Sequence, residues 1–314
     1  MEHYVTLFDS VFVPQGLALH ESLESHAGDY TLWILCMDDE VHSVLTCLNL
    51  PNIELLKLCE VETQELLLIK NSRTRAEYCW TLTPFTFRFV FNKNSKIERV
   101  TYLDADVWFM DSPKLIFDEL DKSNKPVLIT EHAYAPEHDQ SASSGRYCVQ
   151  FITFKRNEGE EVRQWWEDRC IEWCFNRCED GKFGDQKYLD DWPQRFPNKV
   201  HVLQRQEWML APWNVTRFSY SQAIMYHFHG LRLMNKGKVK LTDYIVPPVV
   251  IANVYVPYLK KINNIYKTLR LVDFAPKQQE IYPGFLLRAI RTIRTIRGVF
   301  LLRWRFFPPR FMDL

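Results

Sequence analysis

The sequence contains few of the residues that mark fibrous, low-complexity or membrane-spanning chains. Only 10 Gly and 16 Pro occur among 314 residues, which excludes a collagen-like repeat and a Pro/Gly-rich disordered chain. No run reaches the roughly 18 consecutive apolar residues that a membrane-spanning helix needs. Residues 1–9 lack the basic and apolar regions of a secretory signal. With 46% apolar residues, the chain is predicted to be globular and cytoplasmic.

The sequence also lacks the spacing of a zinc site. Its eight cysteines are expected to be free thiols, because disulfides are rare in the cytoplasm. Cys170, Cys174 and Cys178 recur every four residues and would stack along one face of a helix. No histidine or fourth thiol completes a metal-ligand pattern around them. Buried apolar packing is therefore favoured over a metal site.

Charge is balanced overall but divided unevenly along the chain. The 39 Lys+Arg residues equal the 39 Asp+Glu residues in number. Residues 281–314 contain seven arginines, no lysine and a single acid, so their net charge is +7 − 1 = +6. The first 280 residues must therefore carry −6. An acidic body with a basic C-terminal tail suggests two different tasks.

The tail has the pattern of an amphipathic helix. Arginines at positions 288, 291, 294 and 297 recur every third residue, as do isoleucines at 290, 293 and 296. Such a helix is typical of a segment that lies in an anionic membrane interface, and we predict this peripheral location on the inner face of the membrane. One alternative is a helix docked on the body. Another is a nucleic-acid-binding arm, which the interspersed apolar residues disfavour.

Strand-like runs alternate with helical patterns along the first 260 residues. Strands are predicted at His3–Phe8, Tyr30–Cys36, Ile53–Lys57, Glu98–Leu103, Lys125–Thr130 and Val149–Lys155. Helices are predicted at Leu17–Ser25, Val61–Lys70 and Glu160–Cys178, whereas Thr83–Phe91 fits either structure. The alternation predicts a Rossmann-like α/β domain with a mostly parallel sheet flanked by helices. Since no linker or repeat interrupts it, residues 1–260 are interpreted as one domain and residues 261–314 as a tail.

Two carboxylates follow one of these strands. Asp104 and Asp106 flank Ala105 directly after the apolar segment that ends at Leu103. In parallel sheets ligands bind beyond the carboxyl ends of the strands. Two acids at i and i+2 in a turn can share a divalent cation such as Mg²⁺ or Mn²⁺. A solvated turn without a metal is the alternative.

A second motif alternates histidine with aromatic residues. In Tyr226-His227-Phe228-His229-Gly230, both histidines would lie on the same side of an extended segment. An imidazole added to two carboxylates favours Mn²⁺ over Mg²⁺. Gly230 would let the backbone approach a phosphate, and Arg232 could meet diphosphate charge. The alternative is that these histidines are buried structural residues.

Four segments in a fixed order resemble a known family. TYLDADVWF, GKFGDQKYLDDWP, LAPWNV and YHFHGLR are similar to motifs of the GT-A-fold nucleotide-diphospho-sugar transferases. The similarity is greatest to glycosyltransferase family 8, a retaining family that includes lipopolysaccharide galactosyltransferases and glycogenin. It covers roughly residues 3 to 240, and its specificity lies in the ordered set of motifs.

The resemblance implies roles for several residues. Asp104, Asp106 and His227 would bind the metal, and Asp185 and Gln186 would lie beside the reacting sugar. Contacts to the nucleotide sugar would come from Asp9 at the nucleotide, from Arg73 or Arg88, and from the diphosphate-facing residues Gly230 and Arg232.

Other positions permit two interpretations. Asp185 could also cap the short helix that follows it, and Asp190 and Asp191 are interpreted as a solvated helix end. Trp208 and Trp213 are candidates for stacking on a sugar. The segment Tyr147-Cys148-Val149-Gln150-Phe151 departs from the family's Asn-x-Gly pattern, because Cys148 and Gln150 stand where a small Gly and an amide are expected.

These observations predict a metal-dependent glycosyltransferase (a hexosyltransferase-like enzyme of class EC 2.4). It would take a nucleotide-diphosphate sugar, expected to be a UDP-sugar, and build a surface polysaccharide or lipopolysaccharide on a glycan or lipid-linked acceptor. A nucleotidyltransferase is the first alternative, but residues 9–16 lack its Gly-rich phosphate loop. The second is a non-catalytic, membrane-associated protein that binds nucleotide sugars.

Overall fold

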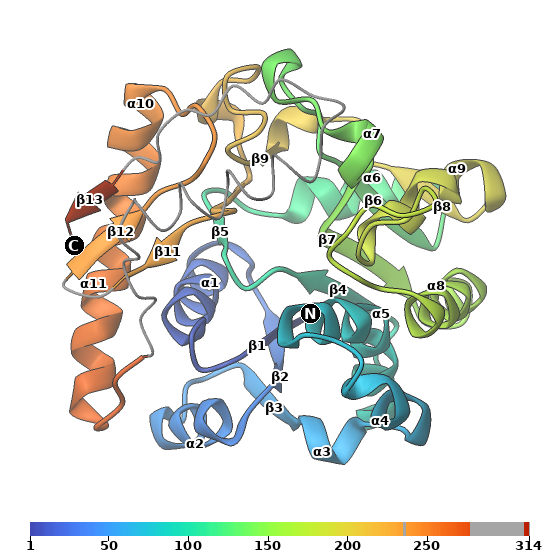
Figure 1. Ribbon diagram of the computed structural model, residues 1–314, viewed down its shortest axis with the longest axis horizontal. Helices are drawn as coiled ribbons and strands as arrows, with labels where there is room; N and C mark the ends of the chain where they lie inside the picture. Colours follow the sequence, from blue (N-terminus) through green and yellow to red (C-terminus); the bar gives the residue numbers. More distant parts are fainter. Residues whose placement is uncertain (235–236, 277–310, 314) are drawn as a thin grey trace, which may run out of the picture.

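The computed structural model describes residues 1–234, 237–276 and 311–313, and its centre is a mixed sheet with helices on both faces (Figure 1). The strand order is β3-β2-β1-β4-β7-β6-β8. The strands are β1 (Glu2–Phe8), β2 (Tyr30–Cys36), β3 (Ile53–Lys57), β4 (Arg99–Leu103), β6 (Val127–Glu131), β7 (Tyr147–Lys155) and β8 (Val200–Val202). Strands β3, β2, β1 and β4 are parallel, whereas β7 is antiparallel to β4 and β6. The predicted α/β class and mostly parallel sheet are confirmed.

Alternation along the central strand assigns side chains to the two faces. In β1, Tyr4 and Phe8 point into one apolar cluster, while Val5 and Leu7 point into the other, as the two-residue period of a strand requires. The first cluster lies under α1 (Val13–His26), α2 (Asp39–Leu48), α6 (Lys114–Ser123) and α11 (Val256–Leu271). The second lies under α4 (Gln64–Lys70), α5 (Arg75–Lys93), α8 (Glu160–Glu172) and α9 (Trp192–Arg195).

The ambiguous aromatic segment is helical. Thr83–Phe91 belongs to α5, a helix of 19 residues. Thr74 and Glu77 form a capping box at its start, in which each side chain meets the backbone N–H of the other residue. Such reciprocal capping satisfies donors that a helix start leaves free. The aromatic residues Phe85, Phe87 and Phe89 of this helix are buried in the second apolar cluster, so packing on the sheet favours the helix despite the β preference of aromatics.

All three predicted helices have different bounds in the structure. The helix expected at Leu17–Ser25 is α1, which begins at Val13, where Pro14 occupies the first turn. The helix expected at Val61–Lys70 is divided into α3 (Leu58–Val61) and α4, because Glu62 is extended and Thr63 caps α4. Helix α8 ends at Glu172 and not at Cys178, since Trp173 adopts an extended conformation. Cys174 and Cys178 lie beyond the end of α8, so the expected single cysteine face on a helix is wrong. Cys170 and Cys174 are buried as expected, whereas Cys178 is exposed. All eight cysteines are free as predicted.

Two small sheets lie beyond the central one. One has the order β5-β10-β9 and the other β11-β12-β13. Their strands are β5 (Val107–Phe109), β9 (Met209–Leu210), β10 (Met225–His227), β11 (Arg232–Leu233), β12 (Lys238–Lys240) and β13 (Phe311–Asp313). The remaining short elements are η1 (Pro136–His138), α7 (Ser141–Ser144), η2 (Gln186–Asp191), η3 (Gln206–Trp208), η4 (Tyr220–Gln222), α10 (Pro248–Val250) and the π-helix η6 (Ile251–Tyr255).

The C-terminal boundary differs from the prediction. Residue 260 lies inside α11, which runs beside α1 (Figure 1). Ile262, Ile265 and Leu269 of α11 are buried in the first apolar cluster. The body therefore continues at least to Leu271. The predicted amphipathic segment, Phe285–Trp304, lies outside the described residues. Within the described part of the chain, every helix is too short or too polar to cross a membrane.

Candidate active site

The turn after β4 is fixed by backbone hydrogen bonds. The N–H of Asp104 donates to the carbonyl of Gln150 on β7 (3.3 Å), and the N–H of Val107 donates to the carbonyl of Asp104 (3.2 Å). The chain therefore leaves the central sheet at Asp104 and enters β5 at Val107. Both aspartates lie in this turn, at the carboxyl end of a parallel strand, where α/β sheets bind ligands.

Strand pairing brings a distant histidine to the same turn. Strand β10 runs antiparallel to β5, and His227 lies opposite Val107. The N–H of the next residue, Phe228, donates to the carbonyl of Asp106 (2.9 Å). His227 therefore ends its strand beside the two aspartates.

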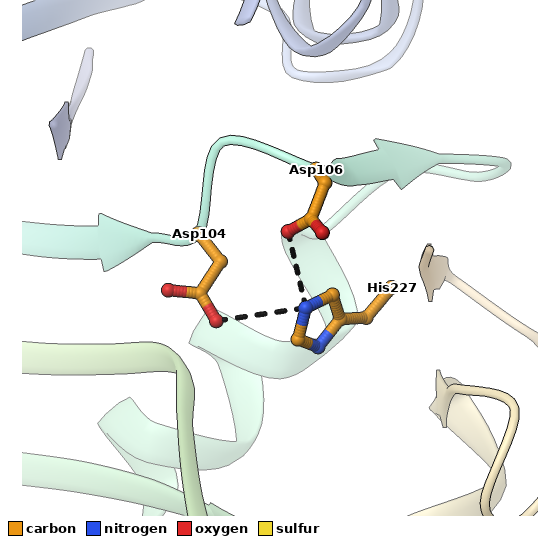
Figure 2. A group of neighbouring side chains, drawn as sticks. All are labelled: Asp104, Asp106 and His227. Carbon is orange, nitrogen blue, oxygen red and sulfur yellow. Dashed lines mark ion pairs between the residues drawn. The ribbon is translucent and has the colours of Figure 1, made fainter. Parts of the chain in front are cut away.

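Asp104, Asp106 and His227 form a compact cluster of three potential metal ligands (Figure 2). The Nε2 atom of His227 lies 3.1 Å from Oδ1 of Asp106 and 3.7 Å from Oδ2 of Asp104. One ligand atom from each residue lies within 4.8 Å of the others. Ligands at about 2.1 Å in octahedral geometry stand about 3 Å apart. The donor set and its spacing fit Mn²⁺ or Mg²⁺.

The three groups shift each other's pKa. Burial lowers the pKa of His227, but the charges of Asp106 and Asp104 outweigh this and hold it well above its usual value. Burial raises the pKa of Asp104 to about 6, because the charge of Asp106 adds to it and that of His227 only partly opposes it. Burial also acts on Asp106, yet His227 dominates and lowers its pKa to about 2. The site therefore carries negative charge that a cation would neutralise.

Asp185 lies close to this cluster. Its side chain is buried, and burial together with the charge of Asp104 raises its pKa to about 7. One carboxylate oxygen, Oδ2, has no hydrogen-bond partner among the described residues. The next residue, Gln186, donates from Nε2 to the carbonyl of Ser144 at 2.6 Å. The structure thus places the Asp-Gln step between the aspartate turn and α7.

The glycine and arginine after β10 also belong to this region. Gly230 has a φ of +79°, a conformation that favours glycine because other residues carry a Cβ. The guanidinium of Arg232 lies over the ring of Phe12 at 5.8 Å. Burial raises the pKa of Asp106, but His227, His229 and, to a smaller extent, the positive charge of Arg232 lower it. The positively charged guanidinium of Arg232 therefore lies near the carboxylates.

Asp9 has an arginine partner that the sequence did not indicate. The Nε atom of Arg75 lies 2.8 Å from Oδ2 of Asp9, and its Nη2 atom lies 2.5 Å from Oδ2 of Asp38. Asp38 also caps α2 by accepting from the N–H of Val41 (2.9 Å). Arg75 thus joins the carboxyl ends of β1 and β2 to the start of α5. The Thr74–Glu77 capping box marks the start of α5 in the sequence. It therefore indicated that Arg75 is the first residue of this helix.

The two arginines expected at the donor have partners on α8 and in the segment just after it. Arg73 donates to the carbonyls of Cys174 (2.6 Å), Cys170 (3.2 Å) and Ile171 (2.9 Å). Arg88 pairs with Glu167, whose Oε2 lies 3.3 Å away. Both guanidinium groups therefore support the packing of α8. Their contact with the donor stays a prediction, and these partners do not favour it.

Trp213, a candidate for sugar stacking, is buried behind the histidine. Its indole is 3% exposed and donates to the carbonyl of His132 at 2.8 Å. Its ring meets that of His227 edge-on, with centroids 5.3 Å apart. A residue covered in this way supports the imidazole and offers no stacking face. The family-like segment LAPWNV therefore belongs to the wall of the site.

Gln150 and Cys148, the two residues of β7 that depart from the family pattern, lie next to the same histidine. Oε1 of Gln150 is 2.7 Å from Nδ1 of His227, and the thiol of Cys148 contributes to the raised pKa of this imidazole. Both side chains are buried. No periodicity in the sequence relates residues 148–150 to residue 227, so these contacts could not be foreseen.

Sequence comparison identifies relatives in Bacillus subtilis (strain 168). The uncharacterized protein YfnF is 33% identical over 260 residues, which cover 76% of this chain and 84% of YfnF. The chain belongs to the YfnF family. A second relative, the uncharacterized protein YfnD, is 29% identical over 301 residues, covering 90% of this chain and 93% of YfnD. No family model matches the sequence.

Comparison with solved structures shows the fold of this chain. The galactosyltransferase LgtC, solved with donor and acceptor sugar analogs, superposes with a TM-score of 0.50 at 11% identity, covering 83% of this chain and 95% of LgtC. A second LgtC structure is that of an active-site mutant in which a glutamine is replaced by glutamate. The bifunctional glycosyltransferase WbbM gives a TM-score of 0.51 at 15% identity and covers 84% of this chain, which spans half of WbbM. The predicted GT-A fold is confirmed.

Proposed function

We propose that this protein is a metal-dependent glycosyltransferase that transfers a sugar from a nucleotide-diphosphate sugar. The observation that carries the proposal is the cluster of Asp104, Asp106 and His227 at the carboxyl end of β4. Three ligand atoms within 4.8 Å of one another, on a GT-A fold, suit a cation that holds a diphosphate. We infer Mn²⁺ as the preferred ion because the set includes an imidazole.

The leaving group determines what the site must supply. A divalent cation bound by the three ligands would supply Lewis-acid stabilisation of the departing nucleoside diphosphate. Arg232 would add positive charge on the same side, as a fixed group that needs no rearrangement during the reaction. The backbone at Gly230 would lie close to the phosphates, since a glycine leaves no Cβ in the way.

Asp185 and Gln186 are proposed to face the sugar. The unpartnered Oδ2 of Asp185 can accept a hydrogen bond from a sugar hydroxyl, and a pKa of about 7 also allows the protonated acid to donate one. Gln186 is held by Ser144 and is neutral, so it would position the sugar without acting as a nucleophile. LgtC has an active-site glutamine, which supports this assignment. By resemblance, we propose a retaining outcome, with the leaving phosphate accepting the acceptor proton.

Calorimetry and a donor panel test the proposal. The full chain is expected to bind UDP in the presence of Mn²⁺ and to bind it far more weakly after chelation, because the cation links the carboxylates to the diphosphate. A panel of nucleotide sugars is expected to include one that is hydrolysed slowly in the presence of Mn²⁺. Binding without turnover of any donor would indicate a non-catalytic nucleotide-sugar-binding protein. Equal UDP binding with and without metal would contradict the metal role.

The acceptor and location are proposed from the tail. We propose a glycan or lipid-linked acceptor in surface polysaccharide synthesis and attachment to the inner face of an anionic membrane through residues 285–304. The support is the basic amphipathic pattern of that segment.

Replacing Arg291 and Arg294 with Gln is expected to weaken binding to anionic vesicles about 30-fold. Each arginine near such a surface contributes about 1 kcal/mol, and about 1.4 kcal/mol is a tenfold change. Co-sedimentation of the full chain with phosphatidylserine-containing vesicles measures the effect. The matched control replaces Arg177 and Arg205, which pair with acids on the body, and should bind as the wild type does. Equal binding of both double variants would refute the role of the tail.

A further inference from the structure

We propose that Gln150 is a positioning residue for the metal centre. Its side-chain oxygen accepts the Nδ1 proton of His227 and so directs the Nε2 lone pair of that imidazole toward Asp104 and Asp106. This inference rests on the proposed function, because it concerns the same three ligands. It assigns a task to a residue at which the sequence departs from the family pattern.

Gln150 contacts both segments that carry the ligands. Its Oε1 lies 2.7 Å from Nδ1 of His227, and its backbone carbonyl accepts the N–H of Asp104 at 3.3 Å. The residue is fully buried in β7, the strand that pairs with β4. One rigid strand therefore holds the start of the aspartate turn and the imidazole at fixed positions. Supports built on strands hold a site more precisely than supports on loops.

The tautomer of the histidine depends on this contact. A neutral imidazole has one N–H, and a metal needs the nitrogen that lacks it. The oxygen of Gln150 can only accept, so it selects the form with a proton on Nδ1. Nε2, the atom that lies 3.1 Å from Asp106, is then the nitrogen that would give up its proton when a metal binds. Partners on the second nitrogen of metal-bound histidines act in this way.

The remaining contacts of the side chain fit the same task. The Nε2 amide of Gln150 has no hydrogen-bond partner in the described part of the chain. The contact with His227 is therefore the side-chain hydrogen bond that orients Gln150 there. Cys148 lies two residues earlier on the same face of β7 and also meets His227. Trp213 closes the ring edge-on. The imidazole is thus enclosed, and Gln150 fixes which of its nitrogens faces the carboxylates.

The test is Mn²⁺ binding to the full chain without donor, measured by calorimetry. Gln150→Met keeps the volume of the side chain and removes the acceptor. It is expected to weaken Mn²⁺ binding about 10- to 100-fold, the usual effect of losing such a partner. The matched control is Gln15→Met, at another buried glutamine (2% exposed) on α1, which should bind Mn²⁺ as the wild type does.

The outcomes separate this inference from the proposed function. If the wild type and both variants bind Mn²⁺ equally, or if both variants lose the same affinity, the role of Gln150 is overturned and the metal site stands. If the wild type binds no Mn²⁺, both proposals fail. Should Gln150→Met not fold, the long-range ¹H–¹⁵N spectrum of His227 in the Mg²⁺-loaded wild type decides. A proton on Nδ1 supports the inference, and a proton on Nε2 overturns it.

Discussion

Replacing Asp106 with Asn is expected to lower donor hydrolysis by a factor of about 10³ or more, since metal stabilisation of a leaving group is worth several kcal/mol and each 1.36 kcal/mol is tenfold in rate. Asp106 is the ligand closest to His227, and its low pKa of about 2 keeps it charged at all working pH values. An amide at this position removes that charge and leaves the shape of the turn. The loss should appear in kcat/KM for the nucleotide sugar that the donor panel identifies.

An exposed carboxylate gives the control for this experiment. Asp118 on α6 pairs with Lys114 at the surface, and Asp118→Asn should retain wild-type turnover. Calorimetry on Asp106→Asn should also show weakened Mn²⁺ binding, so that the two losses have one cause. An Asp106→Asn variant that turns over donor at the wild-type rate would exclude the proposed metal chemistry.

The positions of six of the seven strands of the central sheet and the aspartate turn could be predicted from local sequence, whereas β8 and the order of the strands in the sheet were not predicted. Each predicted feature depends on neighbours in the chain: an alternating apolar run forms a strand, and Asp104 and Asp106 follow Leu103 immediately. A strand end also has a known role in α/β sheets. The structure accordingly places the two acids where the pattern predicts. The role of His227 as a third ligand was predicted from the family resemblance, because no spacing rule links residue 227 to residue 106.

The supporting contacts could not be predicted, since they depend on pairing between distant strands. Gln150 meets His227 only because β7 pairs with β4 while β10 pairs with β5. The arginines show the same limit. The sequence offered Arg73 and Arg88 as cations near the nucleotide, but the turn before α5 directs Arg73 to α8 and leaves Arg75 beside Asp9. A shift of two residues at the helix start therefore decides which arginine pairs with Asp9.

The buried carboxylate of Asp185 is expected to lower the free energy of unfolding at neutral and higher pH. Its pKa of about 7 in the folded protein exceeds the ordinary value of 3.8. Below pH 3.8 the acid is protonated in both states, so it has no effect. As the pH rises toward 7, the unfolded chain releases the proton while the folded chain retains it, and stability falls. Above pH 7 the ionised carboxylate is buried near Asp104, and the full penalty applies.

Asp185→Asn is therefore expected to raise the free energy of unfolding at pH 8 by about 2 to 4 kcal/mol, since each pKa unit corresponds to about 1.4 kcal/mol. The gain should shrink toward zero near pH 4, because the amide and the protonated acid are both neutral. Urea unfolding of both chains at the two pH values measures it, with Asp118→Asn as the control that should follow the wild type. A gain that is the same at both pH values would show that the buried charge is not its cause. A fall in activity together with the rise in stability would indicate that the carboxylate serves the reaction, because replacing a destabilising active-site residue commonly raises stability at the cost of function.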